Sequence, residues 1–178
     1  MHTVNVIIGL MATASASKAL LYTIPRSFQA AASNCTLPAK FVVTDFITYT
    51  DETNSTLNTV CLEFSDPDTN IKTTCQQNST STPSGPSKNR YACDDANVAF
   101  IYQTTGVAGL TMIERACPGG TGTQLEASGL VTPQLECSNS TTGVLCHAEP
   151  TSIQGDFDSL EPIRPKAPTR RSQRARRG

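Results

Sequence analysis

The residues of this chain that could take part in chemistry are its cysteines and one late histidine. Apart from His2, which lies in the N-terminal leader, the only histidine is His147, and it directly follows Cys146. A Cys-His nucleophile pair requires a free and activated thiol, whereas Cys146 has a disulfide partner close at hand. We therefore interpret His147 as a surface residue and expect no catalytic site. The seven cysteines are Cys35, Cys61, Cys75, Cys93, Cys117, Cys137 and Cys146.

Two other short motifs are compatible with ligand chemistry. Asp94-Asp95 could be an acid/base or calcium pair, but adjacent residues of an extended segment point to opposite faces, and no further acid is spaced to complete a site. Gly119-Gly120-Thr121-Gly122 lacks the lysine and the following helix of a phosphate-binding loop. We interpret both motifs as turns and expect no metal and no cofactor.

The cysteines also indicate an oxidising compartment. A short apolar run ending in Ala14-Ser15-Ala16 predicts a signal peptide over residues 1–16 and an N-terminal segment over residues 17–34, with a later cleavage near residues 30–33 as the alternative. Nowhere do about 18 apolar residues run together, so we expect no membrane span. The chain is predicted to be a secreted, extracellular glycoprotein with acceptor asparagines Asn34, Asn54, Asn78 and Asn139.

Charge is unevenly distributed along the chain. Residues 164–178 hold seven of the 14 lysines and arginines and no acid. The rest of the chain therefore has seven basic and 15 acidic residues, and its formal charge is −8. The basic run could neutralise phosphates, but no aromatic residue interleaves with its arginines, so we expect no nucleic acid partner. Proline and arginine content predicts that residues 151–178 form a disordered basic tail.

Alternation with a period near two runs through the middle of the chain and predicts β-strands. Residues 66–70 have the composition of a turn, and residues 76–90 form one polar loop. The fold class is therefore predicted to be all-β, a small antiparallel β-barrel or sandwich stabilised by disulfides, with one domain over residues 35–150. The expected strands are residues 41–49, 60–64, 71–75, 98–103, 109–115 and 124–131, and the first should place Phe41, Val43, Asp45, Ile47 and Tyr49 on one face.

Two pairs of cysteines bracket local loops. A bridge between Cys75 and Cys93 would close about 18 residues and stabilise the fold by about 3 kcal/mol. Cys137 and Cys146 flank a shorter polar turn, where a bridge would contribute somewhat less. Six cysteines allow fifteen pairings, so spacing alone leaves the connectivity open.

One series of segments combines cysteine order with strand rhythm over roughly residues 35–150: Cys35 with Phe41-Val42-Val43-Thr44-Asp45-Phe46, Val60 to Phe64, Thr74-Cys75, Tyr91-Ala92-Cys93, Gly109-Leu110-Thr111-Met112, and Cys137 with Cys146. This series resembles the Alternaria major allergen family of small secreted fungal β-barrel proteins. The resemblance implies intrachain bridges Cys75–Cys93 and Cys137–Cys146, and it implies that Cys35 can link two chains. Cys61 and Cys117 have no counterpart in the family pattern, so they form a third bridge or rewire the others.

An odd number of cysteines leaves at least one thiol without an intrachain partner. Cys61 and Cys117 lie on or next to expected strands that a sheet could bring together. Cys35 precedes the first strand on a segment rich in alanine and serine, where a thiol could reach a second molecule. We therefore predict a partial covalent homodimer through Cys35.

The resemblance implies a non-enzymatic, allergen-like or effector-like protein. Its implied partners are a host plant defence protein or a cell-wall component, or a small phenolic ligand. A secreted hydrolase or hydrolase inhibitor is the first alternative, and it predicts an activity that depends on Asp94, Asp95 or His147. The second alternative is a binder of anionic surfaces, and it predicts that binding is lost when residues 164–178 are deleted.

Overall fold

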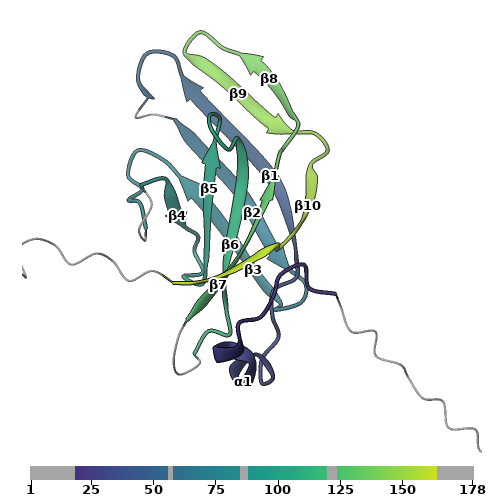
Figure 1. Ribbon diagram of the computed structural model, residues 1–178. Helices are drawn as coiled ribbons and strands as arrows, with labels where there is room; N and C mark the ends of the chain where they lie inside the picture. The colour runs from purple at the N-terminus through teal and green to yellow at the C-terminus, as the bar shows by residue number, and fades with distance from the viewer. Residues whose placement is uncertain (1–18, 56–57, 85–87, 120–123, 164–178) are drawn as a thin grey trace, which may run out of the picture.

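The computed structural model describes residues 19–55, 58–84, 88–119 and 124–163 (Figure 1). The predicted signal peptide, most of the glycine-rich turn and the basic run at 164–178 lie outside these residues. In chain order the elements are η1 (Arg26–Phe28), α1 (Gln29–Ala32), β1 (Lys40–Asp51), β2 (Thr59–Asp66), β3 (Ile71–Gln77), β4 (Arg90–Ala92), β5 (Val98–Gln103), β6 (Gly109–Ala116), β7 (Leu125–Val131), β8 (Leu135–Asn139), β9 (Gly143–Ala148), β10 (Ser152–Asp156) and β11 (Ser159–Pro162).

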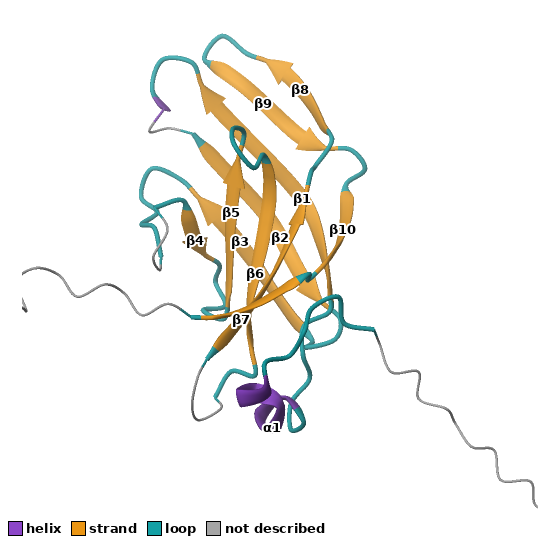
Figure 2. Ribbon diagram, viewed as in Figure 1, coloured by secondary structure: helices purple, strands orange, loops and turns teal. Residues whose placement is uncertain are grey.

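The strands form two antiparallel sheets, as Figure 2 shows. The first sheet has the order β3-β2-β1-β9-β8, and β10 pairs with β1 beyond the end of β9. The second sheet has the order β11-β7-β6-β5-β4. The predicted all-β class is thereby confirmed. Of the two architectures expected, the described residues adopt the sandwich, because their strands divide into two sheets and do not close into one.

Several strands follow the predicted alternation closely. β5 has the expected bounds, and β6 and β7 differ from expectation by one residue at one end. The hairpin between β2 and β3 forms at residues 66–70, where the Asp66 carboxylate accepts hydrogen bonds from the backbone N–H groups of Asp68 at 2.6 Å and Thr69 at 3.2 Å. The short helical segment η1–α1 and strands β4 and β8–β11 were not predicted.

The alternation in β1 changes face at Asp45, contrary to the prediction. Phe41 and Val43 point into the core as expected, but the next buried residue is Phe46, whereas Ile47 is 41% exposed. The pairing of β1 with β2 shifts register between Thr44 and Ile47, and Asp45 has φ 52°. One extra residue in a β-bulge reverses the side chains beyond it, so the single-face reading of residues 41–49 is wrong.

The core lies between the sheets and is built around aromatic rings. The ring centroid of Phe41 is 6.1 Å from that of Phe64 and 5.0 Å from that of Phe157. Phe157 is fully buried although it follows β10, in the segment that was predicted to be a disordered tail. Residues 152–162 form β10 and β11, one in each sheet, so the expected domain boundary at residue 150 is wrong.

The N-terminal segment also belongs to the domain. It lies at one end of the two sheets (Figure 1), and Tyr22 and Phe28 are buried there. Phe28 packs in a second apolar cluster with Ala116, Cys117 and Leu125 at the end of the second sheet. Residues that were expected to lie outside the barrel therefore close one end of the sandwich.

This packing corrects the prediction for the cysteines. Cys75 is bonded to Cys93 and Cys137 to Cys146, the two pairs that the resemblance implies. Cys35 is bonded to Cys117, which is 82 residues away, and Cys61 is the free thiol. The reason is that the N-terminal segment brings Cys35 against the end of β6, whereas Cys61 lies in β2, in the other sheet, opposite Ile47 and Gln76. An interchain bond through Cys35, and a bond between Cys61 and Cys117, are both incompatible with this arrangement.

Candidate ligand-binding site

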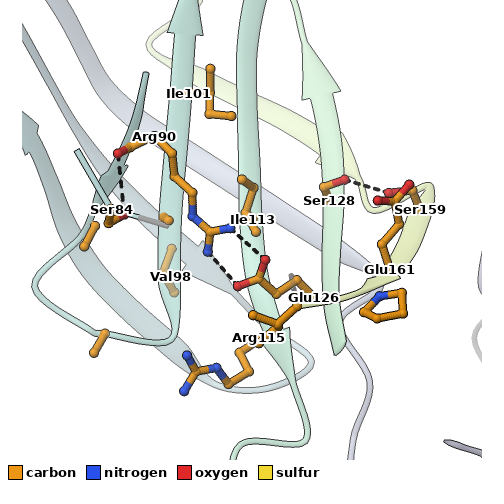
Figure 3. A pocket seen from close by; sticks show the side chains of 15 residues that line it. Ser84, Arg90, Val98, Ile101, Ile113, Arg115, Glu126, Ser128, Ser159 and Glu161 are labelled. Carbon is orange, nitrogen blue, oxygen red and sulfur yellow. Dashed lines mark hydrogen bonds and ion pairs between the residues drawn. The ribbon is translucent and has the colours of Figure 1, made fainter. Parts of the chain in front are cut away.

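A cavity of about 540 Å³ lies on the outer face of the second sheet (Figure 3). Its floor is one row of residues that the strand registers bring side by side across all five strands. Because neighbouring residues of a strand point to opposite faces, this row turns away from the core, while Phe100, Met112 and Ala127 in the rows on either side of it are buried between the sheets. The floor residues are Ala92, Ala99, Ile113, Ser128 and Ser159.

An arginine crosses this floor from one side of the sheet to the other. Arg90 in β4 reaches over β5 and β6 to Glu126 in β7, as Figure 3 shows, with Nη1 2.7 Å from Oε2 and Nη2 2.6 Å from Oε1. The aliphatic stem of an arginine can cover apolar surface while its head remains paired. Ile113 accordingly keeps only 7% of its surface exposed although it faces outward. We call this space the Arg90 cavity.

The Arg90–Glu126 pair is bidentate and largely removed from solvent. The two side chains are 17% and 16% exposed, respectively. Two parallel charge-assisted hydrogen bonds hold the guanidinium in a fixed plane. Removing one partner would leave a desolvated charge, which costs about 3 kcal/mol. The pair therefore fixes the position of a cation above an apolar floor.

Hydroxyl and carboxylate groups lie on the β7–β11 side of the Arg90 cavity. The Oγ atoms of Ser128 and Ser159 lie 2.6 Å apart, and Glu161 continues the same side on β11 (Figure 3). At the opposite side the backbone N–H of Ser84 donates to the carbonyl oxygen of Arg90 at 2.7 Å. The Nε atoms of Arg90 and of Arg115, which also lines the cavity, are buried with no hydrogen-bond acceptor among the described residues. Donors and acceptors thus surround the apolar centre.

The residues that the sequence singled out for catalysis do not come together. Cys146 is consumed by its bond to Cys137, and His147 is exposed on β9 with its Nε2 3.9 Å from Oε2 of Glu136. Asp94 is exposed in the loop before β5. Asp95 lies in the same loop, where its Oδ1 accepts a hydrogen bond of 2.8 Å from the backbone N–H of Asn97. Both aspartates thus lie in a turn.

The predicted glycan acceptors lie at turns or strand ends. Asn34 follows α1, Asn54 follows β1, Asn78 follows β3 and Asn139 ends β8. Asn78 is partly engaged, since its Oδ1 accepts hydrogen bonds from the backbone N–H of Thr80 at 3.0 Å and from its hydroxyl at 2.8 Å. Asn34, Asn54 and Asn139 are exposed, and glycosylation of all four stays a prediction.

The free thiol of Cys61 is half-buried on β2. Burial raises its pKa, and the nearby charges of Glu63 and Asp45 raise it further. A thiol with a raised pKa is a weak nucleophile, because the thiolate is the reactive form.

Sequence reasoning missed the two residues that define the Arg90 cavity. Arg90 was placed at the end of a polar loop, and Glu126 was read as one position of a strand. They are 36 residues apart, and only the registers of β4, β5, β6 and β7 bring them together. The available signal was weak: each is a charged residue flanked by an apolar residue on a segment rich in strand formers.

Comparisons with known proteins provide little further information about this site. No family model matches the chain, and no curated protein matches it. Among solved structures, the crystal structure of the Alternaria alternata allergen Alt a 1 is similar, with a TM-score of 0.48 and 12% sequence identity over 70% of this chain and 89% of the allergen. A likeness at this level provides no basis for transferring a ligand, a partner or an activity.

Two further observations concern only the part of the chain that the structure describes. None of its helices is long and apolar enough to cross a membrane. No three of its histidine, cysteine, aspartate and glutamate side chains are placed to hold a metal ion.

Proposed function

We propose that this chain is a secreted, non-enzymatic binding protein that takes a small phenolic ligand in the Arg90 cavity. Secretion is supported by the sequence of the leader and by three intrachain disulfides, which are typical of oxidising compartments. The observation that carries the proposal is the Arg90 guanidinium, held in plane by Glu126 above the apolar floor. A planar cation of this kind attracts the face of an aromatic ring.

The size and rim of the cavity suit the same ligand class. A volume of about 540 Å³ falls within the range of small-molecule sites, which are mostly apolar with a few polar groups that fix orientation. Ala92 and Ala96, the exposed alanines of the lining, would contact the ring. The hydroxyl groups of Ser128 and Ser159 and the carboxylate of Glu161 would exchange hydrogen bonds with phenolic hydroxyls.

The test is calorimetric titration of the full secreted chain with p-coumaric acid. Cinnamic acid lacks the phenolic hydroxyl, and cyclohexanepropionic acid also lacks the aromatic ring. We expect saturable binding of p-coumaric acid, about threefold to tenfold weaker binding of cinnamic acid through the lost hydrogen bond, and still weaker binding of the saturated acid. Equal affinities for the three compounds, or no saturable binding, would refute the proposal.

A paired variant links the binding to this cavity. In the double variant Arg90→Gln/Glu126→Gln both charges are removed while a neutral hydrogen-bonding pair remains, so neither partner is left as an isolated buried charge. We expect about tenfold weaker binding of p-coumaric acid. The matched control is Lys40→Gln/Asp156→Asn, which neutralises the exposed pair whose Nζ and Oδ1 atoms are 3.8 Å apart on the first sheet. The control should bind like the unmodified protein.

A further inference from the structure

Arg115 of β6 lines the Arg90 cavity, and among the described residues no acid pairs with its guanidinium. In the strand register Arg115 lies opposite Glu126 of β7. Both carboxylate oxygens of Glu126 are already bonded to Arg90, at 2.7 and 2.6 Å. Figure 3 shows that the guanidinium of Arg115 points away from this pair. Two arginines thus lie beside one acid, and Arg90 alone pairs with it.

The side chain of Arg115, and not its backbone, lacks a hydrogen-bond partner. Its backbone N–H donates to the carbonyl oxygen of Asn97 at 2.8 Å. Its Nε atom is buried and meets no acceptor in the described part of the chain. A guanidinium has five N–H donors in one plane, and removing them from water without acceptors is unfavourable. Arg115 therefore supplies the cavity with a positive charge and with donors that no described residue uses.

The opposite side of the cavity has the reverse character. Glu161 of β11 lies opposite Glu126 in the strand register, and Glu126 lies between it and Arg115. Neighbouring strands are about 4.8 Å apart, so the backbones of Glu161 and Arg115 are about 10 Å from each other. The hydroxyl groups of Ser128 and Ser159 lie on the same side as Glu161. Glu161 would repel an anion that Arg115 attracts, so the cavity has a cationic side and an acidic, hydroxyl-bearing side.

We propose that Arg115 binds the carboxylate of the ligand, so that the Arg90 cavity takes a phenolic carboxylic acid in preference to a neutral phenol. This inference rests on the proposed function, and it adds a negative charge that a phenol bound by Arg90 alone would not need. A guanidinium and a carboxylate can form two parallel charge-assisted hydrogen bonds. The phenolic hydroxyl would then lie at Ser128 and Ser159, two strand spacings or about 10 Å away, a span that suits one aromatic ring with a short side chain.

The experiment is calorimetric titration of the full secreted chain at pH 7 with p-coumaric acid and with p-coumaramide. The amide keeps the ring and the phenolic hydroxyl but has no charge, whereas the acid is ionised at this pH. We expect the acid to bind at least about tenfold more tightly than the amide. Equal affinities, or tighter binding of the amide, would overturn the inference.

Variants assign the preference for the acid to Arg115. In Arg115→Gln the acid should bind about tenfold more weakly than to the unmodified protein, and the ratio of acid to amide affinity should fall to about one. Arg115→Lys keeps the charge without the planar fork and should retain part of the ratio. The matched control is Lys72→Gln, which removes a positive charge from an exposed position of β3 in the first sheet and should retain the full ratio. A full ratio in Arg115→Gln, or an equal loss in Lys72→Gln, would overturn the inference.

Cinnamic acid tests the orientation of the ligand. It keeps the carboxylate and lacks the phenolic hydroxyl, so its weaker binding relative to p-coumaric acid should persist in Arg115→Gln, because the two groups lie at opposite sides of the cavity. Loss of this difference in Arg115→Gln would overturn the assignment of the carboxylate to Arg115. If neither p-coumaric acid nor its amide binds, the proposed function fails, and the role of Arg115 fails with it. If both bind equally, the proposed function stands and only the role of Arg115 fails.

Discussion

In the absence of ligand, the buried carboxyl group of Glu114 should make stability depend on pH. Its pKa is raised from the ordinary value of 4.5 to about 8, first by burial and then by the negative charge of Asp66. Below pH 4.5 both the folded and the unfolded chain hold the proton. Between pH 4.5 and 8 the unfolded chain has released it while the folded chain retains it, so the free energy of unfolding falls as pH rises, and the loss is complete above pH 8.

The size of the effect follows from the two pKa values. The difference between 4.5 and about 8 corresponds to about 5 kcal/mol as an upper limit, since one pKa unit equals about 1.4 kcal/mol. Asp66 takes part in the same titration, so a loss of about 2 to 4 kcal/mol by pH 8.5 is the working expectation. Tyr22 does not contribute in this range, because burial and then the charges of Asp66 and Glu114 raise its pKa to about 12.

The variant Glu114→Gln isolates this contribution. Glutamine keeps the shape of the protonated acid and cannot ionise, so the variant should match the unmodified protein within about 1 kcal/mol at pH 5 and exceed its stability by about 2 to 4 kcal/mol at pH 8.5. The measurement is urea unfolding followed by circular dichroism at pH 5, 6.5 and 8.5. Glu52→Gln, an exposed acid after β1, is the control and should show a difference that is small at every pH. A constant difference between Glu114→Gln and the unmodified protein across this range would refute the reasoning.

Three further predictions test the fold. Deleting residues 164–178 should leave the melting temperature nearly unchanged. A longer deletion of residues 151–178 should abolish cooperative unfolding, because it removes two strands and the fully buried Phe157. Similar melting of both truncations would contradict the strand assignment. Cys61→Ser should remove the one thiol that reacts with Ellman's reagent after unfolding without reductant, and a thiol that persists would contradict the pairing of the other six cysteines. Asp45→Val should destabilise the protein by about 1–2 kcal/mol in urea unfolding because a β-branched residue is strained at φ 52°, and an equal loss for Asp45→Gly would contradict the bulge argument.

The strands that the sequence predicts best are those with one strongly buried face. β5 and β6 are predicted well because Phe100, Leu110 and Met112 fill the core, and both strands are rich in apolar and β-branched residues, although their burial does not alternate strictly. β8 does not show such a pattern, since four of its five residues are exposed and only Leu135 and Cys137 are apolar. In β10 a glycine takes the place of an inward side chain: a Cβ atom at Gly155 would lie 2.3 Å from Cζ of Phe41. Alternation of hydrophobic residues cannot reveal a strand that has glycine at an inward position, or a strand whose two faces are both exposed to solvent.

The candidate sites depend on contacts that local patterns do not contain. Arg90 and Glu126 meet only because four strands pair in one register, and Cys35 meets Cys117 only because the N-terminal segment folds over the end of the second sheet. The sequence does contain the excess of acids in the body of the chain. The sequence does not show where these acidic residues gather in the fold, because the acids around Glu114 come from β2, the β2–β3 turn and the loop before β5.

One strand has the Arg90 cavity on one face and a buried acid on the other. Ile113 and Arg115 of β6 line the Arg90 cavity, while Glu114 between them is fully buried on the opposite face. Adjacent residues of a strand point to opposite faces, so the cavity and Glu114 lie on the two sides of one sheet. Single substitutions at these positions should therefore affect one side at a time. An insertion of one residue in β6 before Ile113 would exchange the faces, place a carboxylate against the Arg90–Glu126 pair, and disrupt both sides together.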